Sequence, residues 1–221
     1  MTATLTHRGP DEDGFYTRDH VALGARRLSI IDVAGSHQPV HSEDRRVWAV
    51  FNGELYNFKA LRAELEGLGH RFGTLGDSEV VAHAWEAWGE RSAERLRGMF
   101  AFALWDERQE SLLLVRDRIG IKPLYWSWDG RTLLFGSEMK ALLSARAEHA
   151  LGGLDPAALR AFLCFGYVPA PLSMFEGVRC LPPGHQLVLR RAAAPAVRPY
   201  WELPRAGAQT LLEDEAQAIT E

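Results

Sequence analysis

FNGELYN, residues 51–57, joins an apolar strand pattern to an Asn-Gly pair and the carboxylate of Glu54. The apolar run over residues 46–51 predicts a strand that ends at Asn52-Gly53, because Asn-Gly pairs favour turns. The side-chain amide of Asn52 and the backbone N–H of Gly53 would then lie together at the end of a sheet. Glycine at such a position lets another molecule approach the backbone closely. Taken alone, however, an Asn-Gly pair after a strand is more often a simple turn.

Three other polar segments accompany this stretch, and they are HRGPD at residues 7–11, RLSIID at residues 27–32 and GDSE at residues 76–79. Together they add an arginine, Arg27, and a carboxylate, Asp77, to the carboxylate of Glu54. An arginine binds a carboxylate through two parallel hydrogen bonds, and carboxylates in turn bind an ammonium group. The set therefore suits a small amino acid, which carries both groups. Considered singly, Asp77 would be a helix cap, and Arg27 and Glu54 would be solvated surface charges.

The overall composition is ordinary for a globular protein. Of the 221 residues, 47% are hydrophobic and 24% are charged, and the formal net charge is −4. A chain of this length can bury enough apolar surface to fold without disulfides or a structural metal. The absence of dense basic runs argues against nucleic acid as a partner. The apolar runs are too short to span a bilayer and no signal-peptide pattern opens the chain, so we expect a cytoplasmic protein without membrane contact.

Cysteine and histidine spacing indicates no metal or redox site. Cys164 and Cys180 are too far apart for a C-x-x-C motif. Cys164 lies in an apolar helical pattern, which favours a small buried thiol. His37 and His41 are four residues apart, but Pro39 between them argues against a shared helical face. We therefore expect neither a catalytic cysteine nor a bound metal.

Hydrophobic periodicity predicts more strands than helices. Extended segments are expected at residues 21–31, 46–51, 70–73, 99–105, 111–116, 124–128, 132–135 and 184–191. Helices are expected over residues 58–68 and 80–88 and from Pro156 onward, with Asn57, then Asp77 or Ser78, and Asp155 as their N-caps. Residues 192–197 are predicted to be a loop and residues 211–219 the beginning of a helix. Consecutive hairpins make antiparallel sheet, which the few helices must cover from outside.

Taken in chain order, these segments resemble the glutaminase domain of glutamine-hydrolysing asparagine synthetases, a class II (N-terminal nucleophile) amidotransferase. Two further segments carry the likeness, residues 98–105 and RDRIGIKPLY at residues 116–125, and it runs from residue 5 to about residue 203. Related amidotransferases for hexosamine or purine synthesis lack the Leu55-Tyr56-Asn57 continuation. Residues 84–89 and 165–171 look most like synthetase paralogues from bacterial exopolysaccharide or exosortase clusters.

The resemblance implies a fold of the α+β class, a four-layer αββα sandwich in which helices flank two stacked antiparallel sheets. It also implies an amidotransferase domain over residues 1–202, followed over residues 203–221 by a linker and the start of a synthetase domain. The family has a strand and a helix before the His7-Arg8-Gly9 corner. We therefore expect this chain to lack that first strand and helix.

The resemblance assigns roles to individual residues. The substrate-binding residues would be Arg27, Ile30, Ile31, Glu54 and Asp77. Arg27 would pair with the α-carboxylate of glutamine, Glu54 and Asp77 would hold its α-ammonium, and the isoleucine backbones would line the pocket. Asn52 and Gly53 would form the oxyanion hole, where losing one donor typically costs about 10²–10³ in rate. Arg8, Asp117, Arg118, Lys122 and Glu138 also match the family, and for them we favour structural or interdomain roles.

The nucleophile of the family is a cysteine that becomes N-terminal when methionine is removed, and its α-amino group carries the proton. In this sequence Met1 is followed by Thr2. We therefore expect this chain alone to bind glutamine weakly at most and not to hydrolyse it. Thr2 could serve as a terminal nucleophile, as threonine does in other folds. It lies on the wrong element for that role, so this is the less favoured alternative.

By the same resemblance, the parent enzyme passes ammonia to a synthetase domain that uses ATP and Mg²⁺ to activate aspartate. The phosphate loop of that domain has no counterpart here, since residues 152–155 read as a helix start, so we expect no cofactor in this chain itself. The implied partners are L-glutamine and a synthetase domain or subunit, while a homodimer and the identity of the acceptor stay open. The rival interpretation is a non-catalytic module that senses glutamine or docks onto a separate synthetase subunit.

Overall fold

The structure is a computed structural model that describes residues 1–28, 35, 37–145 and 151–204. Its strands are β1 (Glu12–Arg18), β2 (Val21–Arg27), β3 (Val40–His41), β4 (Val47–Leu55), β5 (Gly98–Asp106), β6 (Ser111–Arg116), β7 (Tyr125–Trp128), β8 (Leu133–Gly136), β9 (Val178–Cys180), β10 (His185–Arg190) and β11 (Ala196–Pro199). Its helices are α1 (Phe58–Gly67), α2 (Val80–Trp88), α3 (Ser92–Arg95), α4 (Met139–Leu143) and α5 (Pro156–Phe165), with 3-10 helices η1 (Thr2–Arg8) and η2 (Gly89–Arg91).

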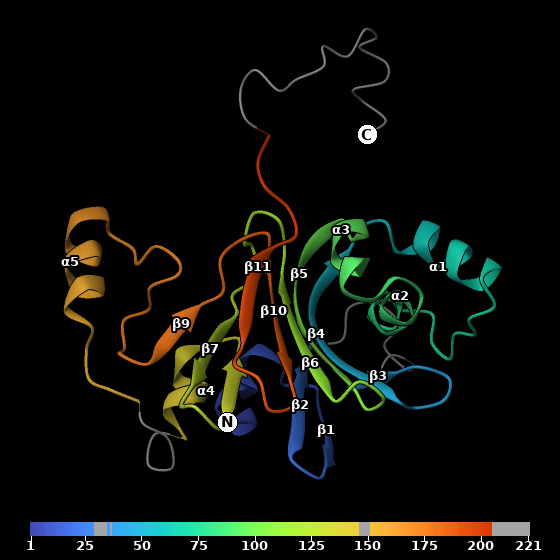
Figure 1. The fold of residues 1–221 in the computed structure, drawn as a ribbon, viewed down its shortest axis with the longest axis horizontal. Coiled ribbons are helices and arrows are strands. Elements are labelled where there is room, and N and C mark those ends of the chain that lie inside the picture. Colours follow the sequence, from blue (N-terminus) through green and yellow to red (C-terminus); the bar gives the residue numbers. More distant parts are fainter. Residues whose placement is uncertain (29–34, 36, 146–150, 205–221) are drawn as a thin grey trace, which may run out of the picture.

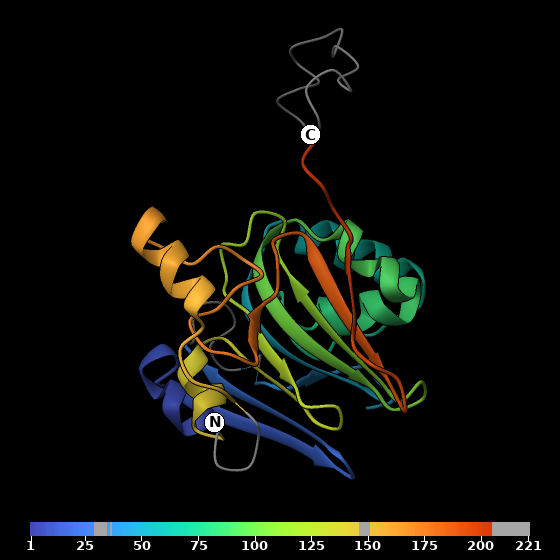
Figure 2. The same ribbon diagram turned by 60° about the vertical axis from the view of Figure 1, so that its left-hand side comes forward.

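A six-stranded sheet in the order β11-β10-β6-β5-β4-β3 forms the centre of the molecule. Helices α1, α2 and α3 cover one face of it (Figure 1). The hairpin β1–β2 and the three-stranded sheet β8-β7-β9 lie on the other side, with α4 and η1 outside them (Figure 2). All pairings between these strands are antiparallel. The stacked sheets with outer helices confirm the expected α+β sandwich, although the second layer consists of two smaller sheets.

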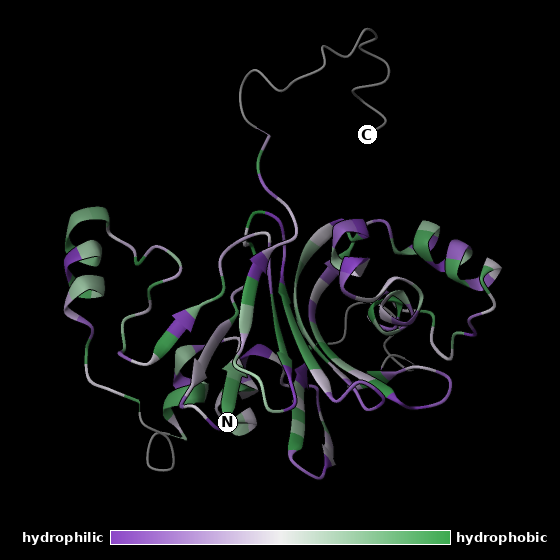
Figure 3. Cartoon of the chain, in the orientation of Figure 1, coloured by the Kyte–Doolittle hydropathy of each residue, from purple (hydrophilic) through white to green (hydrophobic). Residues whose placement is uncertain are grey.

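Alternation along β4 decides which side each residue faces. Val47, Ala49 and Phe51 belong to the core under the helices, whereas Val50 belongs to the core between the sheet layers. Successive side chains of a strand point to opposite faces. Asn52 and Glu54 therefore share the side of Val50. Hydrophobic residues run along the central strands β5 and β6, which are buried on both faces (Figure 3).

The prediction that the strand ends at Asn52-Gly53 is wrong. β4 continues through both residues to Leu55, and Gly53 lies opposite Phe100 in β5. Gly53 has φ of +149°, and a Cβ atom there would lie 2.0 Å from the carbonyl oxygen of Met99. Glycine is required here by the close approach of β5, and not by a turn.

Most other expected elements are present, with local differences. The hairpins β5–β6 and β7–β8 and the helices α1, α2 and α5 lie where predicted, and Asp155 Oδ1 accepts the N–H groups of Ala157 and Ala158 as an N-cap. No strand forms at residues 70–73, and part of the predicted loop at residues 192–197 belongs to β11. Residues 29–31 and 211–219 lie outside the described residues.

The predicted helix caps are met only in part. Asn57 holds the N-cap position of α1, but its side chain makes no cap hydrogen bond and instead bonds the backbone of Arg95 and Arg97 (both 3.0 Å). The residue at the N-cap of α2 is Glu79, so neither Asp77 nor Ser78 holds that position. The side chains of Asn57 and Asp77 instead bond the backbone of other segments, which local sequence patterns do not reveal.

The prediction of a buried Cys164 is also wrong, because α5 buries only Ala158 and leaves Cys164 exposed. In Figures 1 and 2 this helix stands away from the central sheet. Of the helices in the described ranges, none combines the length and apolar character needed to cross a bilayer.

Candidate functional site

A cavity of about 520 Å³ lies between the central sheet and the second layer. It is lined by residues of η1, β2, β4, β5 and β8 and includes Asn52. The Nδ2 atom of Asn52 is buried and has no hydrogen-bond partner among the described residues. Leaving such a donor unsatisfied costs roughly 1–3 kcal/mol. The amide of Asn52 is therefore a donor available to an acceptor that enters the cavity.

The backbone around Asn52 is fixed from both sides. Gln38, which also lines the cavity, donates to the carbonyl of Phe51 (2.8 Å) and accepts the N–H of Phe51 (2.7 Å). On the β5 side, the fully buried Asp117 accepts the N–H of Phe100 (3.3 Å), the residue opposite Gly53. The predicted oxyanion-hole residues thus belong to a rigid strand. Gln38 was missed at the level of sequence, where nothing distinguishes it from a surface glutamine.

Glu54 and Asp77 come together at the end of β4. Asp77 is only 6% exposed, and its Oδ2 accepts the N–H of Leu55 (2.8 Å). Burial raises the pKa of Asp77, although hydrogen bonds from backbone N–H groups oppose this. Burial and the nearby Asp77 raise the pKa of Glu54, while Lys122 lowers it. Two adjacent carboxylates with raised pKa values favour a cation between them, because an opposite charge stabilises both ionised forms.

Arg27 ends β2 and is only 8% exposed. It lies opposite Glu12 in the β1–β2 hairpin, and its Nη1 is 3.4 Å from Glu12 Oε2. The structure therefore places Arg27 in the second layer, across from the strand that carries Asn52. Ile30 and Ile31 lie outside the described residues. The binding roles of these three residues stay predictions.

Four of the other five residues that match the family make contacts typical of structural groups, and the fifth is Lys122. Arg8 pairs with Glu138 at 3.0 Å, and Arg118 donates to the carbonyl of Glu94 at 3.0 Å. Asp117 accepts the N–H groups of Phe100, Ile119, Ile121 and Lys122. Asp117 thereby fixes the turn that brings Lys122 near Glu54.

Neither cysteine of the sequence lines the cavity. Cys180 is buried beside Arg116, and burial raises the pKa of its thiol, which disfavours the reactive thiolate. Thr2, from η1, does line the cavity and packs against Gly24 of β2. Its hydroxyl is thus in the same cavity as the Asn52 amide.

The fold is that of glutamine amidotransferases. The glutamine phosphoribosylpyrophosphate (PRPP) amidotransferase from B. subtilis complexed with ADP and GMP matches with a TM-score of 0.53. The two share 22% sequence identity, and the match covers 81% of this chain and 35% of that one. At this identity the likeness shows the fold alone.

Sequence comparison defines the family. A family model described as "Glutamine amidotransferase domain" matches residues 1–201. Asparagine synthetase [glutamine-hydrolyzing] 1 of Bacillus subtilis (strain 168) is 41% identical over 190 residues, which cover 86% of this chain and 30% of that protein. Amidase chry2 of Gibberella zeae is 38% identical over 203 residues, which cover 90% of this chain and 29% of the amidase. This chain belongs to the glutamine amidotransferase domain family.

The chain spans about a third of the length of the curated relatives it matches. The comparisons confirm the resemblance to the amidotransferase domain of asparagine synthetases. The finer likeness to exopolysaccharide and exosortase paralogues, the domain boundary near residue 202 and the roles of single residues stay predictions.

Proposed function

We propose that this chain is the glutamine-binding portion of a glutamine-hydrolysing asparagine synthetase, which supplies ammonia for ATP-dependent amidation of aspartate. The observation that carries the proposal is the proximity of the Glu54 and Asp77 carboxylates. The hydrogen bond from the Leu55 N–H to Asp77 holds Asp77 beside the end of β4. Burial raises the pKa of both carboxylates, Asp77 raises that of Glu54 further, and such a pair suits an α-ammonium group. The unsatisfied amide of Asn52, two residues before Glu54, supports it independently.

Each polar group of glutamine has a proposed partner. The α-ammonium lies between Glu54 and Asp77, and the α-carboxylate pairs with Arg27, with the backbones of Ile30 and Ile31 beside it. The side-chain carbonyl of glutamine points to the Asn52 amide and the Gly53 N–H. When a nucleophile adds to this carbonyl, the oxygen becomes negative, and the two donors stabilise it before the C–N bond breaks and ammonia leaves.

The proposal concerns binding and oxyanion stabilisation, and it assigns no nucleophile. A synthetase domain or subunit would use ATP and Mg²⁺ to activate the acceptor and would consume the ammonia. A glutamine-sensing module would use the same pocket without releasing ammonia. The two functions therefore differ in product and not in binding site.

Calorimetric titration of the purified chain with L-glutamine tests the pocket. We expect saturable binding that Glu54→Gln and Asp77→Asn each weaken at least about tenfold, which corresponds to about 1.4 kcal/mol. Glu66→Gln is the matched control, because Glu66 lies on the exposed side of α1, where it pairs with Arg62. Unchanged affinity in both pocket variants would overturn the proposal. Measuring ammonia release in the same samples separates an amidotransferase from a sensor.

A further inference from the structure

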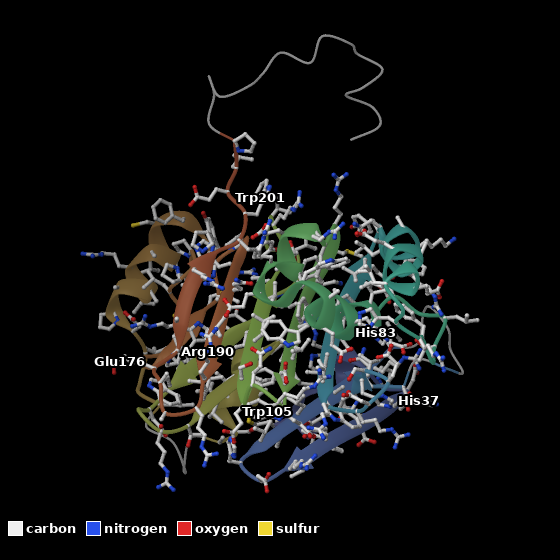
Figure 4. The ribbon with its side chains drawn as sticks, turned by 45° about the vertical axis from the view of Figure 1, so that its right-hand side comes forward. His37, His83, Trp105, Glu176, Arg190 and Trp201 are labelled. Atoms are coloured by element: carbon white, nitrogen blue, oxygen red, sulfur yellow. The ribbon has the colours of Figure 1, made fainter. Side chains whose placement is uncertain are left out.

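Four side chains that can bind a metal converge on the helix side of the central sheet, away from the cavity. They are Glu43 after β3, His70 after α1, and His83 and Glu86 on α2. One ligand atom from each lies within 4.8 Å of the others. His83 is fully buried, and Glu43 and His70 border the surface. Figure 4 labels His83 on the helix side of the molecule.

The spacing of these atoms fits ligands around an ion. His83 Nδ1 is 3.4 Å from Glu43 Oε2 and 3.7 Å from Glu86 Oε2, and His70 Nδ1 is 3.4 Å and 3.7 Å from oxygens of the same two carboxylates. These distances exceed the about 2.7–3.2 Å of a normal N–H···O hydrogen bond. Ligand atoms about 2.0–2.2 Å from a tetrahedral Zn²⁺ lie about 3.3–3.6 Å from one another.

Two of the four ligand atoms are buried and unsatisfied. Within the described part of the chain, neither His83 Nδ1 nor Glu86 Oε2 has a hydrogen-bond partner. The lining of a packed helix layer rarely contains two such atoms side by side, because each one costs free energy. Both atoms belong to the cluster, so a cation there would satisfy them together.

The second nitrogen of His83 is held in the way that metal-binding histidines are held. His83 Nε2 is 3.3 Å from Glu79 Oε1. The Glu79 carboxylate is itself fixed by the N–H of Gly73 (2.8 Å) and by the N–H and hydroxyl of Thr74 (both 2.7 Å). A carboxylate that accepts the Nε2 proton leaves the lone pair on Nδ1, facing the cluster.

The two carboxylate ligands are oriented as well. The second oxygen of Glu86 pairs with Arg108, and Glu43 Oε1 accepts the N–H of Arg71 (2.6 Å). Such outer partners fix the direction of first-sphere ligands.

The competing explanation is a set of ion pairs without metal. Burial alone lowers the pKa of His83, but the carboxylates of Glu79, Glu86 and Glu43 raise it to about 9. In that state a proton occupies Nδ1, and it would form a short hydrogen bond to one carboxylate. The long and nearly equal distances to Glu43 and Glu86 fit a shared ion better.

We propose that Glu43, His70, His83 and Glu86 bind a divalent transition metal ion, with Zn²⁺ as the best match. Imidazole ligands favour Zn²⁺ over Mg²⁺, and two imidazoles with two carboxylates complete a four-coordinate site. The ion joins the β3–β4 connection, the segment after α1, and α2. Its role is to stabilise the helix layer.

The test uses the chain stripped with a chelator and then titrated with Zn²⁺ alone, followed by calorimetry and thermal unfolding. We expect one tight equivalent of Zn²⁺ and a rise in Tm, and neither effect with the same concentration of Mg²⁺. Glu43→Gln and His70→Gln, at partly exposed positions, should each weaken Zn²⁺ binding more than about tenfold, and Glu79→Gln by about 10–100-fold. His185→Gln, at a histidine outside the cluster, should bind like the parent chain.

Two results would overturn the proposal. One is Zn²⁺ uptake by the parent chain no greater than that of the Glu43→Gln, His70→Gln double variant. The other is a Tm that Zn²⁺ leaves unchanged in a chain that binds it. The thermal-unfolding profiles of the metal-free variants show whether each one is folded, so a loss of binding by misfolding is recognised.

Discussion

Asp77 and Glu79 are two residues apart, both are buried, and their carboxylates behave in opposite ways. Burial raises the pKa of Asp77, and this effect prevails over its backbone hydrogen bonds. Burial has the same sign at Glu79, yet hydrogen bonds from His83, Gly73 and Thr74 lower its pKa to about 2. The difference lies in the donors: Glu79 receives enough of them to be stable as an anion, whereas the backbone donors of Asp77 do not offset its burial. Satisfied carboxylates hold a fold together, and under-compensated ones are suited to bind a cation.

Glu79→Ala should have the largest effect on the contrast between these two carboxylates. It removes the carboxylate that accepts four hydrogen bonds, so His83 and the Thr74 hydroxyl each lose this acceptor. Removing one partner of a buried charged pair typically costs about 3–5 kcal/mol. Urea denaturation in the presence of a chelator measures the loss, with Glu66→Ala as the exposed control. A loss below about 1 kcal/mol would mean that Glu79 is not the satisfied anion described here.

Gly53→Ala tests the backbone that carries the pocket. The new methyl group meets the Met99 carbonyl, and the φ of +149° is strained for alanine, so we expect a loss of about 1–3 kcal/mol in unfolding free energy. Glutamine binding should weaken as well, because β4 must shift away from β5. The control is Gly153→Ala, where a Cβ atom meets no atom within 4 Å. Equal stability of the two variants would refute the close-approach argument.

Asp77→Asn should separate binding from stability. Asparagine keeps an oxygen that can accept the Leu55 N–H but removes the negative charge beside Glu54. We expect the unfolding free energy to change by less than about 1 kcal/mol, while glutamine affinity falls at least about tenfold. A large loss of stability with unchanged affinity would assign Asp77 to the fold instead of the pocket.

A pH series should show the smallest effect. The raised pKa values of Glu54 and Asp77 mean that the folded chain binds more protons than the unfolded one between the unfolded and folded pKa values. Their contribution to stability is therefore fully present below the unfolded pKa and is lost as pH rises through the folded values. Urea denaturation from pH about 3 to about 7 should show the parent chain losing stability relative to a Glu54→Gln, Asp77→Asn double variant, because the other carboxylates act alike in both chains. Parallel curves for the two chains would contradict it.

Local patterns in the sequence predicted the elements well where the chain is strongly periodic. The apolar runs that predicted β5 and β6 and the Asp155-Pro156 start of α5 are present as expected. The Asn52-Gly53 prediction failed because turn propensity yielded to pairing with β5, a contact between residues far apart in sequence. The prediction that Cys164 is buried failed for a related reason. Periodicity marks the apolar face of a helix but does not show whether another element covers that face.

The candidate site came only from the family resemblance, which assigned Glu54 and Asp77 to one ammonium group, and these roles stay predictions. The proposed metal ligands gave almost no signal. His83 and Glu86 are spaced i, i+3 on a helix, but Glu43 and His70 reach them only through the fold. Ligand sets that are assembled from separate loops have no fixed spacing to find in a sequence.

The double hydrogen bond between Gln38 and Phe51 has a consequence for self-association. Beside β4, the two-residue β3 pairs only as far as Ala49, and the Gln38 amide satisfies both backbone groups of Phe51 beyond it. A strand edge with free N–H and C=O groups can template intermolecular sheet growth and aggregation. One glutamine side chain imitates a neighbouring strand at that point, so it blocks the addition of a foreign chain next to the Asn52 pocket.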